Sequence, residues 1–216
     1  MSFISYLING ISLGSVYAII ALGYTMVYGI AKMLNFAHGD IIMVGSYVAF
    51  IAINSMGLPV PVSILLSVVV CTVLGMVIER VAYKPLRHAS KLAVLITAIG
   101  ASYFLQNVAL LIFGANTKSF TSIVGNGSVQ LAGGALSVTM VTIVTVIACV
   151  VIMIGLMAFM KYSKAGHAML AVSEDKGAAQ LMGINVNATI ALTFAIGSGL
   201  AAIAGVLLCS AYPSLT

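Results

Sequence analysis

The feature that most constrains this sequence is the length of its uncharged segments. Charged side chains are absent from 1–31, 41–78, 92–117, 119–160 and 177–216. Each run is long enough for one or two membrane-spanning helices of roughly 20 residues. Only 6% of the 216 residues are charged, whereas roughly 25% are charged in a typical soluble domain. We therefore expect the bilayer to be the solvent, and an all-α, polytopic integral membrane helical bundle to be the fold.

Breaker residues divide these runs into six predicted spans. The Gly-Leu-Pro-Val-Pro stretch at 57–61 splits the second run, because a continuous helix does not tolerate such a cluster. The stretch from Lys118 to Gly134 is rich in Ser, Thr, Asn and Gly and is expected to form an exposed loop. The predicted spans are 11–31, 41–56, 61–79, 92–113, 135–160 and 188–210.

The distribution of basic residues predicts the orientation of the chain. With six spans, Lys32 and the loops at 80–91 and 161–176 share one side and hold eight of the nine Lys and Arg residues, which leaves only Lys118 opposite. The positive-inside rule places these loops in the cytoplasm. The basic residues do not form one polar face, so no nucleic-acid partner is expected. The whole chain, 1–216, is read as a single transmembrane domain in contact with lipid, with a cytoplasmic loop at 161–187.

Small residues recur every four positions in two of the predicted spans. Gly197, Ala201 and Gly205 form one set, and Gly10 and Gly14 belong to another. Such spacing lets helix backbones approach closely in a membrane. It is compatible with packing inside this chain and with a subunit interface or pathway wall.

A short polar segment separates the first two spans and contains Asn35, His38, Gly39 and Asp40. Ionisable residues at membrane depth are costly and usually mark a pathway, and Gly39 permits a broken helix. These residues are therefore candidates for a translocation path. The alternative is a short cytoplasmic turn in which Asn35 or Asp40 caps a helix. A metal site is not expected, because no second His or Cys lies at ligand spacing.

The second candidate segment is predicted to be a cytoplasmic helix. Ser173 suits its N-cap, Glu174 and Asp175 suit its first turn, Ala178 lies within it, and Gly183 suits the position after its end. A helix of about two and a half turns is too short to be stable alone in water. It is either a docking element for a soluble subunit or a connection along the membrane surface.

The sequence also lacks the motifs of common enzymes. It has no G-x-x-x-x-G-K-[ST] phosphate loop and no G-x-S-x-G, H-E-x-x-H or C-x-x-C. Cys71, Cys149 and Cys209 lie far apart within apolar runs, which is typical of small buried side chains. We therefore expect a transport subunit without catalytic residues and without a cofactor of its own.

Several motifs follow one another in a recognisable order over nearly all of the chain. They are Gly14–Ala18, Gly23–Ile30, Asn35–Asp40, Ile78–Arg87, Tyr162–Gly166, Glu174–Asp175 with Gly183–Asn185, and Ala191–Phe194 with Ala204–Leu207. Together they resemble the LivH-type permeases of bacterial branched-chain amino acid ABC importers. Members of that family continue for several tens of residues beyond the position of Thr216, so the resemblance implies a chain that lacks the C-terminal spans.

The resemblance implies a multi-pass protein of the bacterial inner membrane that imports Leu, Ile and Val. Its expected partners are a second related permease subunit, two cytoplasmic ATPase subunits that bind ATP and Mg²⁺, and an extracytoplasmic solute-binding protein. The coupling helix of such importers falls on Ser173 to Gly183. Three alternatives stay open: an ABC permease for urea or short amides, a secondary carrier without ATPase subunits in which Asn35, His38 and Asp40 form an ion path, and an inactive fragment.

Overall fold

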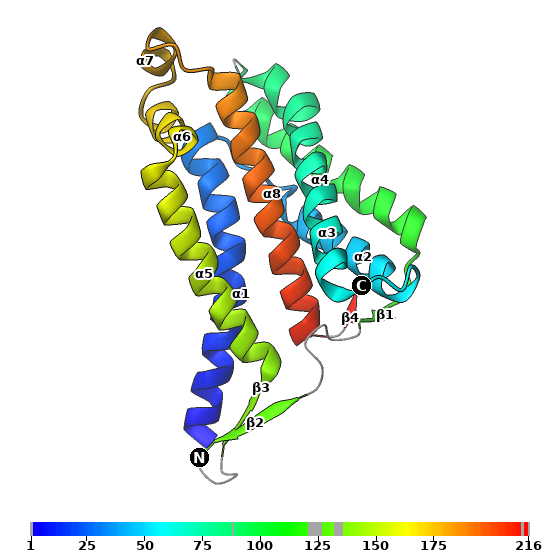
Figure 1. Cartoon of the computed structure of the whole chain (residues 1–216). Helices are drawn as coiled ribbons and strands as arrows, with labels where there is room; N and C mark the ends of the chain where they lie inside the picture. Colours follow the sequence, from blue (N-terminus) through cyan, green and yellow to red (C-terminus); the bar gives the residue numbers. More distant parts are fainter. Residues whose placement is uncertain (1, 88, 121–126, 132–135, 213, 216) are drawn as a thin grey trace.

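The chain folds into a bundle of helices with two small antiparallel strand pairs (Figure 1). The computed structural model describes residues 2–87, 89–120, 127–131, 136–212 and 214–215. The helices are α1 (Ser2–Ala31), α2 (His38–Asn54), α3 (Val60–Ile78), α4 (Lys91–Phe113), α5 (Met140–Tyr162), α6 (Lys164–Glu174), α7 (Lys176–Leu181) and α8 (Val186–Ala211). A π-helical turn (Glu79–Tyr83) and a 3-10 turn (Lys84–Leu86) follow α3. The strands are β1 (Lys118–Ser119), β2 (Ser128–Leu131), β3 (Leu136–Thr139) and β4 (Ser214–Leu215), paired as β1 with β4 and β2 with β3.

The predicted helical membrane bundle is confirmed. Five helices, α1, α3, α4, α5 and α8, are long and apolar enough to cross a membrane. The remaining predicted span, 41–56, corresponds to α2. Its 17 residues rise only about 26 Å, which is less than the roughly 30 Å thickness of a hydrocarbon core. The predicted break between α2 and α3 is present, and Gly57 lies there with a φ of 64°.

One predicted span begins later than expected. The fifth span was predicted to begin at residue 135, whereas α5 begins at Met140. The difference arises because Leu136–Thr139 pairs with β2 as the second strand of a hairpin. Part of the predicted loop from Lys118 to Gly134, at 121–126 and 132–134, lies outside the described residues.

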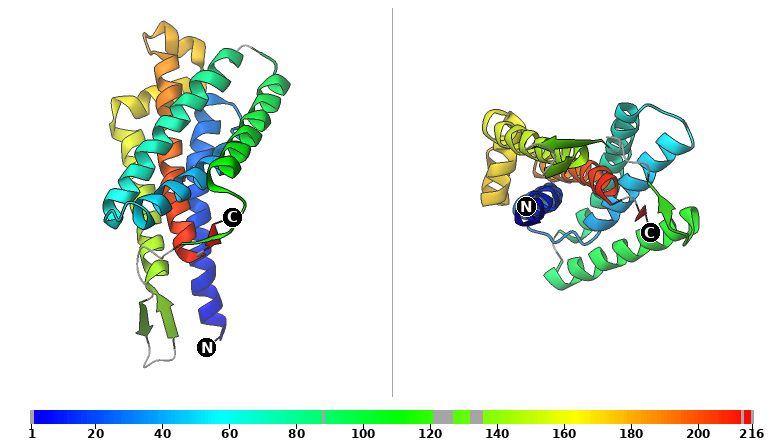
Figure 2. Two further views of the ribbon diagram at one scale, coloured as in Figure 1. Left: turned by 90° about the vertical axis from the view of Figure 1, so that its right-hand side faces the viewer. Right: turned by 90° about the horizontal axis from the view of Figure 1, so that it is seen from below.

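Helix α8 forms the centre of the bundle. It packs against α1, α2 and α3, and more lightly against α5 and α6. The view along the bundle in Figure 2 shows α8 in red between the α1 and α5 side and the α2 side. Its residues Phe194 and Ala201 are completely buried. The core of the protein is therefore a helix surrounded by other helices, as expected where lipid surrounds the outside.

Small residues set the distances between these helices. A Cβ atom at Gly197 would lie 2.8 Å from Val27 of α1, and one at Gly205 would lie 2.5 Å from the carbonyl oxygen of Ile42 in α2. Gly10 and Gly14 differ, because a Cβ atom there would have no described atom within 4 Å. The Gly197, Ala201 and Gly205 set therefore packs inside this chain, and the set on α1 faces outward.

The two ends of the bundle differ. Helices α6 and α7 lie together at the end opposite the N-terminus (Figure 1). The β2–β3 hairpin lies near the N-terminus of α1. The basic loops lie at the α6 and α7 end, and the positive-inside rule predicts that this end is cytoplasmic.

Candidate functional site

The helical structure is interrupted between α1 and α2. Residues 32–37 are not helical, and Lys32 has a φ of 58°. The His38 ring lies against α1, so that a Cβ atom at Gly23 would be 3.0 Å from its Cε1 atom. Gly23 precedes the end of α1 at Ala31 by eight residues, or roughly 12 Å along the helix. Helix α2 therefore begins inside the bundle, beside α1 and before the C-terminal end of that helix.

The structure tests one part of the turn interpretation of the polar segment, the side-chain cap. The capping residue of α2 is Ala37, and neither Asn35 nor Asp40 caps the helix through its side chain. The expectation that Asn35 or Asp40 caps the helix is therefore wrong. The physical reason is that their side chains contact other elements of the bundle instead.

Three of the four predicted residues are buried, and each contacts a different element. Asn35, His38 and Asp40 expose 2%, 4% and 6% of their surface, while Gly39 is exposed. The Tyr83 hydroxyl donates a 3.1 Å hydrogen bond to Asn35 Oδ1. The His38 ring packs edge-to-face on Tyr24 of α1, with 5.9 Å between the ring centroids. The start of α2 is thus held between α1 and the turn that follows α3.

Asp40 is held by the fourth helix. Gln106 of α4 donates a hydrogen bond of 3.0 Å from Nε2 to Asp40 Oδ1. Among the described residues, no partner reaches Asp40 Oδ2 or His38 Nε2, although both atoms are buried. A buried polar atom without a partner is costly, and such residues within a membrane usually serve a substrate, an ion or a proton.

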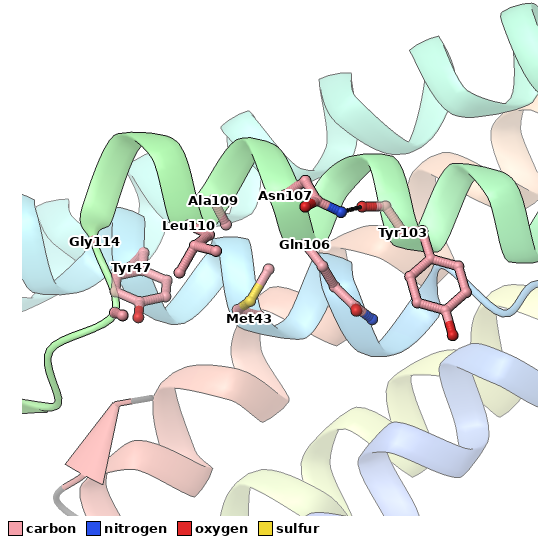
Figure 3. Close-up of a pocket in the computed structure, with 9 residues that line it drawn as sticks. Met43, Tyr47, Tyr103, Gln106, Asn107, Ala109, Leu110 and Gly114 are labelled. Carbon is pink, nitrogen blue, oxygen red and sulfur yellow. Dashed lines mark hydrogen bonds between the residues drawn. The ribbon is translucent and has the colours of Figure 1, made fainter.

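A cavity of about 450 Å³ lies between α2 and α4 (Figure 3). Its wall combines apolar groups such as Met43 and Leu110 with the polar side chains of Tyr103, Gln106 and Asn107. Gln106 thus contacts both the cavity and Asp40. These α4 residues were not predicted from the sequence, although amide side chains within an uncharged span were a signal that could have identified them.

The predicted cytoplasmic segment contains two helices where one was expected. Ser173 and Glu174 belong to the last turn of α6, and Ser173 Oγ donates to the Leu170 carbonyl oxygen. Asp175 is the N-cap of α7, and its Oδ1 accepts from the backbone N–H groups of Gly177 (2.7 Å) and Ala178 (3.0 Å).

The predicted start at Ser173 is therefore wrong by two residues. The reason is that α6, capped by Ser163, continues through Ser173, so that the carboxylate of Asp175 caps the next helix. The position of Gly183 agrees with the expected end, since it follows α7 with a φ of 81°.

Helix α7 is tied to the membrane-spanning helices. Lys176 Nζ donates a 2.8 Å hydrogen bond to the carbonyl oxygen of Ala31, the last residue of α1. Burial lowers the pKa of Lys176, and the positive charges of Arg87 and Lys32 lower it further. A cation at the C-terminal end of a helix is favourable. Lys176 therefore joins α7 to the end of α1, directly before the non-helical residues 32–37.

A buried ion pair holds the neighbouring turn. Arg87 pairs with Glu79, and both side chains are largely buried. Arg87 also donates to the Asn187 side chain at the start of α8. Together with the Tyr83 and Lys176 contacts, this pair connects α1, α3, α7 and α8 at the same end of the bundle.

These features define a multi-pass membrane protein with polar groups buried at a helix break, the construction of a solute permease. The chain belongs to the family of branched-chain amino acid transport system permease components, whose model matches residues 6–214. Proteins of this family are transport subunits and not enzymes, and the same holds for this chain.

The similar proteins have related names. The permease protein BraD of Pseudomonas aeruginosa is 45% identical over 218 residues, which cover 95% of this chain and 70% of BraD. The permease protein LivH of Escherichia coli K12 is 43% identical with the same coverage. Both are named high-affinity branched-chain amino acid transport system permeases. A probable LivH of Methanocaldococcus jannaschii is 29% identical over 197 residues, 88% of this chain and 61% of that protein. No solved structure matches the chain significantly.

Proposed function

We propose that this chain is a membrane permease subunit of an ATP-binding cassette importer that carries Leu, Ile and Val across the bacterial inner membrane. The observation that carries the proposal is the family match over residues 6–214, together with relatives named for branched-chain amino acid transport. In this proposal two cytoplasmic ATPase subunits bind ATP and Mg²⁺, a second related permease completes the membrane part, and an extracytoplasmic protein delivers the solute.

The exposed tip of α7 supports docking to a cytoplasmic subunit. Leu181 and Met182 expose 89% and 82% of their surface at the cytoplasmic end of the molecule, where water would otherwise surround them. Apolar side chains exposed side by side favour a protein partner. The six residues of α7 are too few for a helix that is stable alone, so its caps and a partner must hold it. Ser173, Glu174, Asp175, Ala178 and Gly183 remain the proposed coupling segment around this tip.

The contacts of α7 also supply a route by which ATPase movements reach the membrane. A displacement of α7 acts through Lys176 on the end of α1. Residues 32–37 follow that end and lead directly to His38 and Asp40. In this proposal Asn35, His38, Gly39 and Asp40 form part of the translocation path, and its shape changes when the linker moves.

Uptake measurements test the docking role of α7. In the chain assembled with its partner subunits, Leu181→Asp places a charge at the docking tip, and we expect ATP-driven leucine uptake to fall at least about tenfold, as for the loss of an interface anchor. The matched control is Leu170→Asp, on the exposed side of α6, which should retain uptake. Retention of the ATPase subunits and of uptake by Leu181→Asp, with both variants present in the membrane, would refute the assignment.

The same assay separates the alternative functions. An importer for urea or short amides would accumulate labelled urea or acetamide in preference to leucine. A secondary carrier would lose uptake when an uncoupler is added at constant ATP, whereas the proposed importer would keep it. The buried His38 and Asp40 are compatible with an ion path, so this comparison with an uncoupler is the decisive one.

A further inference from the structure

Three basic side chains from distant parts of the sequence meet at one end of the bundle. Lys176 of α7 donates a 2.8 Å hydrogen bond from Nζ to the carbonyl oxygen of Ala31, and Lys32 directly follows Ala31. Arg87 is close enough that its positive charge, together with that of Lys32, lowers the pKa of Lys176. Like charges repel one another. The fold therefore gathers cations at the junction of α1 and α7.

Carboxylates neutralise this cluster only in part. Glu79 pairs with Arg87, and among the described residues no acidic side chain forms an ion pair with Lys32 or Lys176. Asp175 precedes Lys176, but its carboxylate caps α7. An ammonium group has three N–H donors, and the structure shows one of those of Lys176 in use. Lys32 is exposed and Lys176 is half-buried. Two ammonium groups are therefore available to an anion from outside this chain.

The linker between α1 and α2 adds an apolar strip to this cluster. Its exposed side chains are Lys32, Leu34 and Phe36, and the residues between them are buried, as in an extended segment whose successive side chains point to opposite sides. The linker leads back along α1 to His38, which lies beside Gly23. Leu34 and Phe36 therefore lie alongside the last turns of a helix that is long and apolar enough to cross a membrane.

Cations at the end of a span and apolar side chains beside that span match the two parts of an anionic phospholipid. A phosphate diester accepts charge-assisted hydrogen bonds from ammonium groups. Basic pockets at the ends of membrane helices bind anionic head groups. An acidic surface of a soluble protein would match the two lysines, but it would not reach apolar side chains that lie alongside a membrane helix. The observations therefore favour a lipid.

We infer that Lys32 and Lys176 bind the phosphate diester of an anionic phospholipid, and that one acyl chain of this lipid lies along Leu34 and Phe36. The bound lipid stabilises the junction of α7 and α1, because its charge offsets the repulsion between the two ammonium groups. The inference goes beyond the proposed function, since the lipid is neither the cargo nor a subunit of the importer.

Lipid titration followed by native mass spectrometry tests the head-group contact. The sample is the full chain, purified with the subunits that accompany it. Lys32→Asn removes one charge, and asparagine tolerates the φ of 58° at this position. We expect the dissociation constant for phosphatidylglycerol to rise about fivefold, as for one basic residue near an anionic membrane surface. Lys32→Arg should keep the parent value. The matched control Lys164→Gln, which removes an exposed charge from α6, should also keep it.

Cross-linking in the parent chain locates the lipid. Phosphatidylglycerol with a diazirine in one acyl chain should cross-link to the segment that contains Leu34 and Phe36. Phosphatidylethanolamine with the same diazirine has no net charge, and we expect at most about a fifth of that yield. Glycerophosphoglycerol has the same phosphate diester without acyl chains, and a large excess of it should not displace the lipid. Displacement would mean a site for free phosphate diesters and would overturn the lipid assignment.

Three further results would overturn the inference. An equal loss of affinity in Lys32→Asn and Lys164→Gln would mean that the lipid responds only to the total charge at this end. Equal cross-linking by the two lipids would mean that the linker meets lipid without selecting its head group. Loss of a cytoplasmic subunit from Lys32→Asn, with unchanged affinity for phosphatidylglycerol, would mean that an acidic protein surface covers the cluster. The cross-linking comparison needs no variant, so it decides the question independently of variant folding.

Discussion

Helices α8 and α5 are both long enough to cross the membrane, yet they occupy opposite environments. In the most apolar 18-residue stretch of each helix, 78% of the residues of α8 are buried inside the chain, whereas only 6% of those of α5 are. Helix α5 nevertheless has the higher mean hydropathy. Large side chains such as Val151, Ile154 and Met157 are exposed on α5. Small residues on α8, among them Gly197 and Gly205, meet neighbouring helices. Apolarity therefore identifies a span, and small residues identify the span at the centre of the bundle.

The comparison predicts its largest effect for a bulky residue at a close helix crossing. Gly205→Leu should lower the free energy of unfolding by more than about 3 kcal/mol, because overpacking forces backbones apart. A Cβ atom there already lies 2.5 Å from the Ile42 carbonyl oxygen, which is backbone and cannot rotate away. Thermal unfolding in detergent, followed by size-exclusion chromatography, measures the loss.

The matched control is Gly155→Leu on α5. A Cβ atom at Gly155 has no described atom within 4 Å, so this variant should unfold within about 0.5 kcal/mol of the parent chain. Equal destabilisation by the two variants would break the comparison, because it would mean that α5 is as closely packed as α8.

A smaller loss of stability is expected at the N-terminal end of α8. Arg87 contacts both Glu79 and Asn187, at the start of α8. Arg87→Met leaves the Glu79 carboxylate buried without its cation, which costs about 3 kcal/mol. On α5, Lys161 lies over the Tyr162 ring and is exposed, so Lys161→Met should change stability by less than about 0.5 kcal/mol. Denaturant or thermal unfolding measures the change in the free energy of unfolding for the two variants. Similar changes would contradict the prediction that the Arg87 contacts stabilise the start of α8 more than Lys161 stabilises α5.

The sequence predicted the spans well because each depends on a local property. Charges limit the apolar runs locally, and the Gly57 to Pro61 breaker acts on its own neighbours. Four of the six predicted spans therefore match helices within three residues at both ends, and the other two match except for the early start of α1 and the late start of α5. The depth at which α2 begins was not predictable, because it depends on the contact of His38 with Gly23, a residue of another helix.

The candidate site was predicted only in part for the same reason. The polar segment Asn35–Asp40 stood out because it interrupts apolar sequence, whereas Gln106 and Asn107 lie inside an otherwise ordinary span. Their significance appears when α4 is placed beside α2, where Gln106 meets Asp40. In the predicted cytoplasmic segment, Ser173 and Asp175 are both good capping residues. Because α6 continues through Glu174, Asp175 is the residue that caps the next helix.

The smallest predicted effect concerns one hydroxyl on each of the two helices. Thr145 Oγ1 of α5 is buried and has no partner among the described residues, whereas Thr193 Oγ1 of α8 donates a 2.8 Å hydrogen bond to the Thr189 carbonyl oxygen. Valine has the same shape as threonine without the hydroxyl. Thr145→Val should therefore raise the free energy of unfolding by about 1 kcal/mol, because it removes an unsatisfied group.

Thr193→Val should lower the free energy of unfolding by about 1 kcal/mol, because it loses a hydrogen bond that is made. Parallel melting curves in one detergent measure the difference in sign. A stabilising Thr145→Val would show that this contact of α5 with the bundle is less well satisfied than the core around α8. A destabilising Thr145→Val would mean that the hydroxyl has a partner in the membrane, such as a bound water, and that α5 is better integrated than its burial suggests.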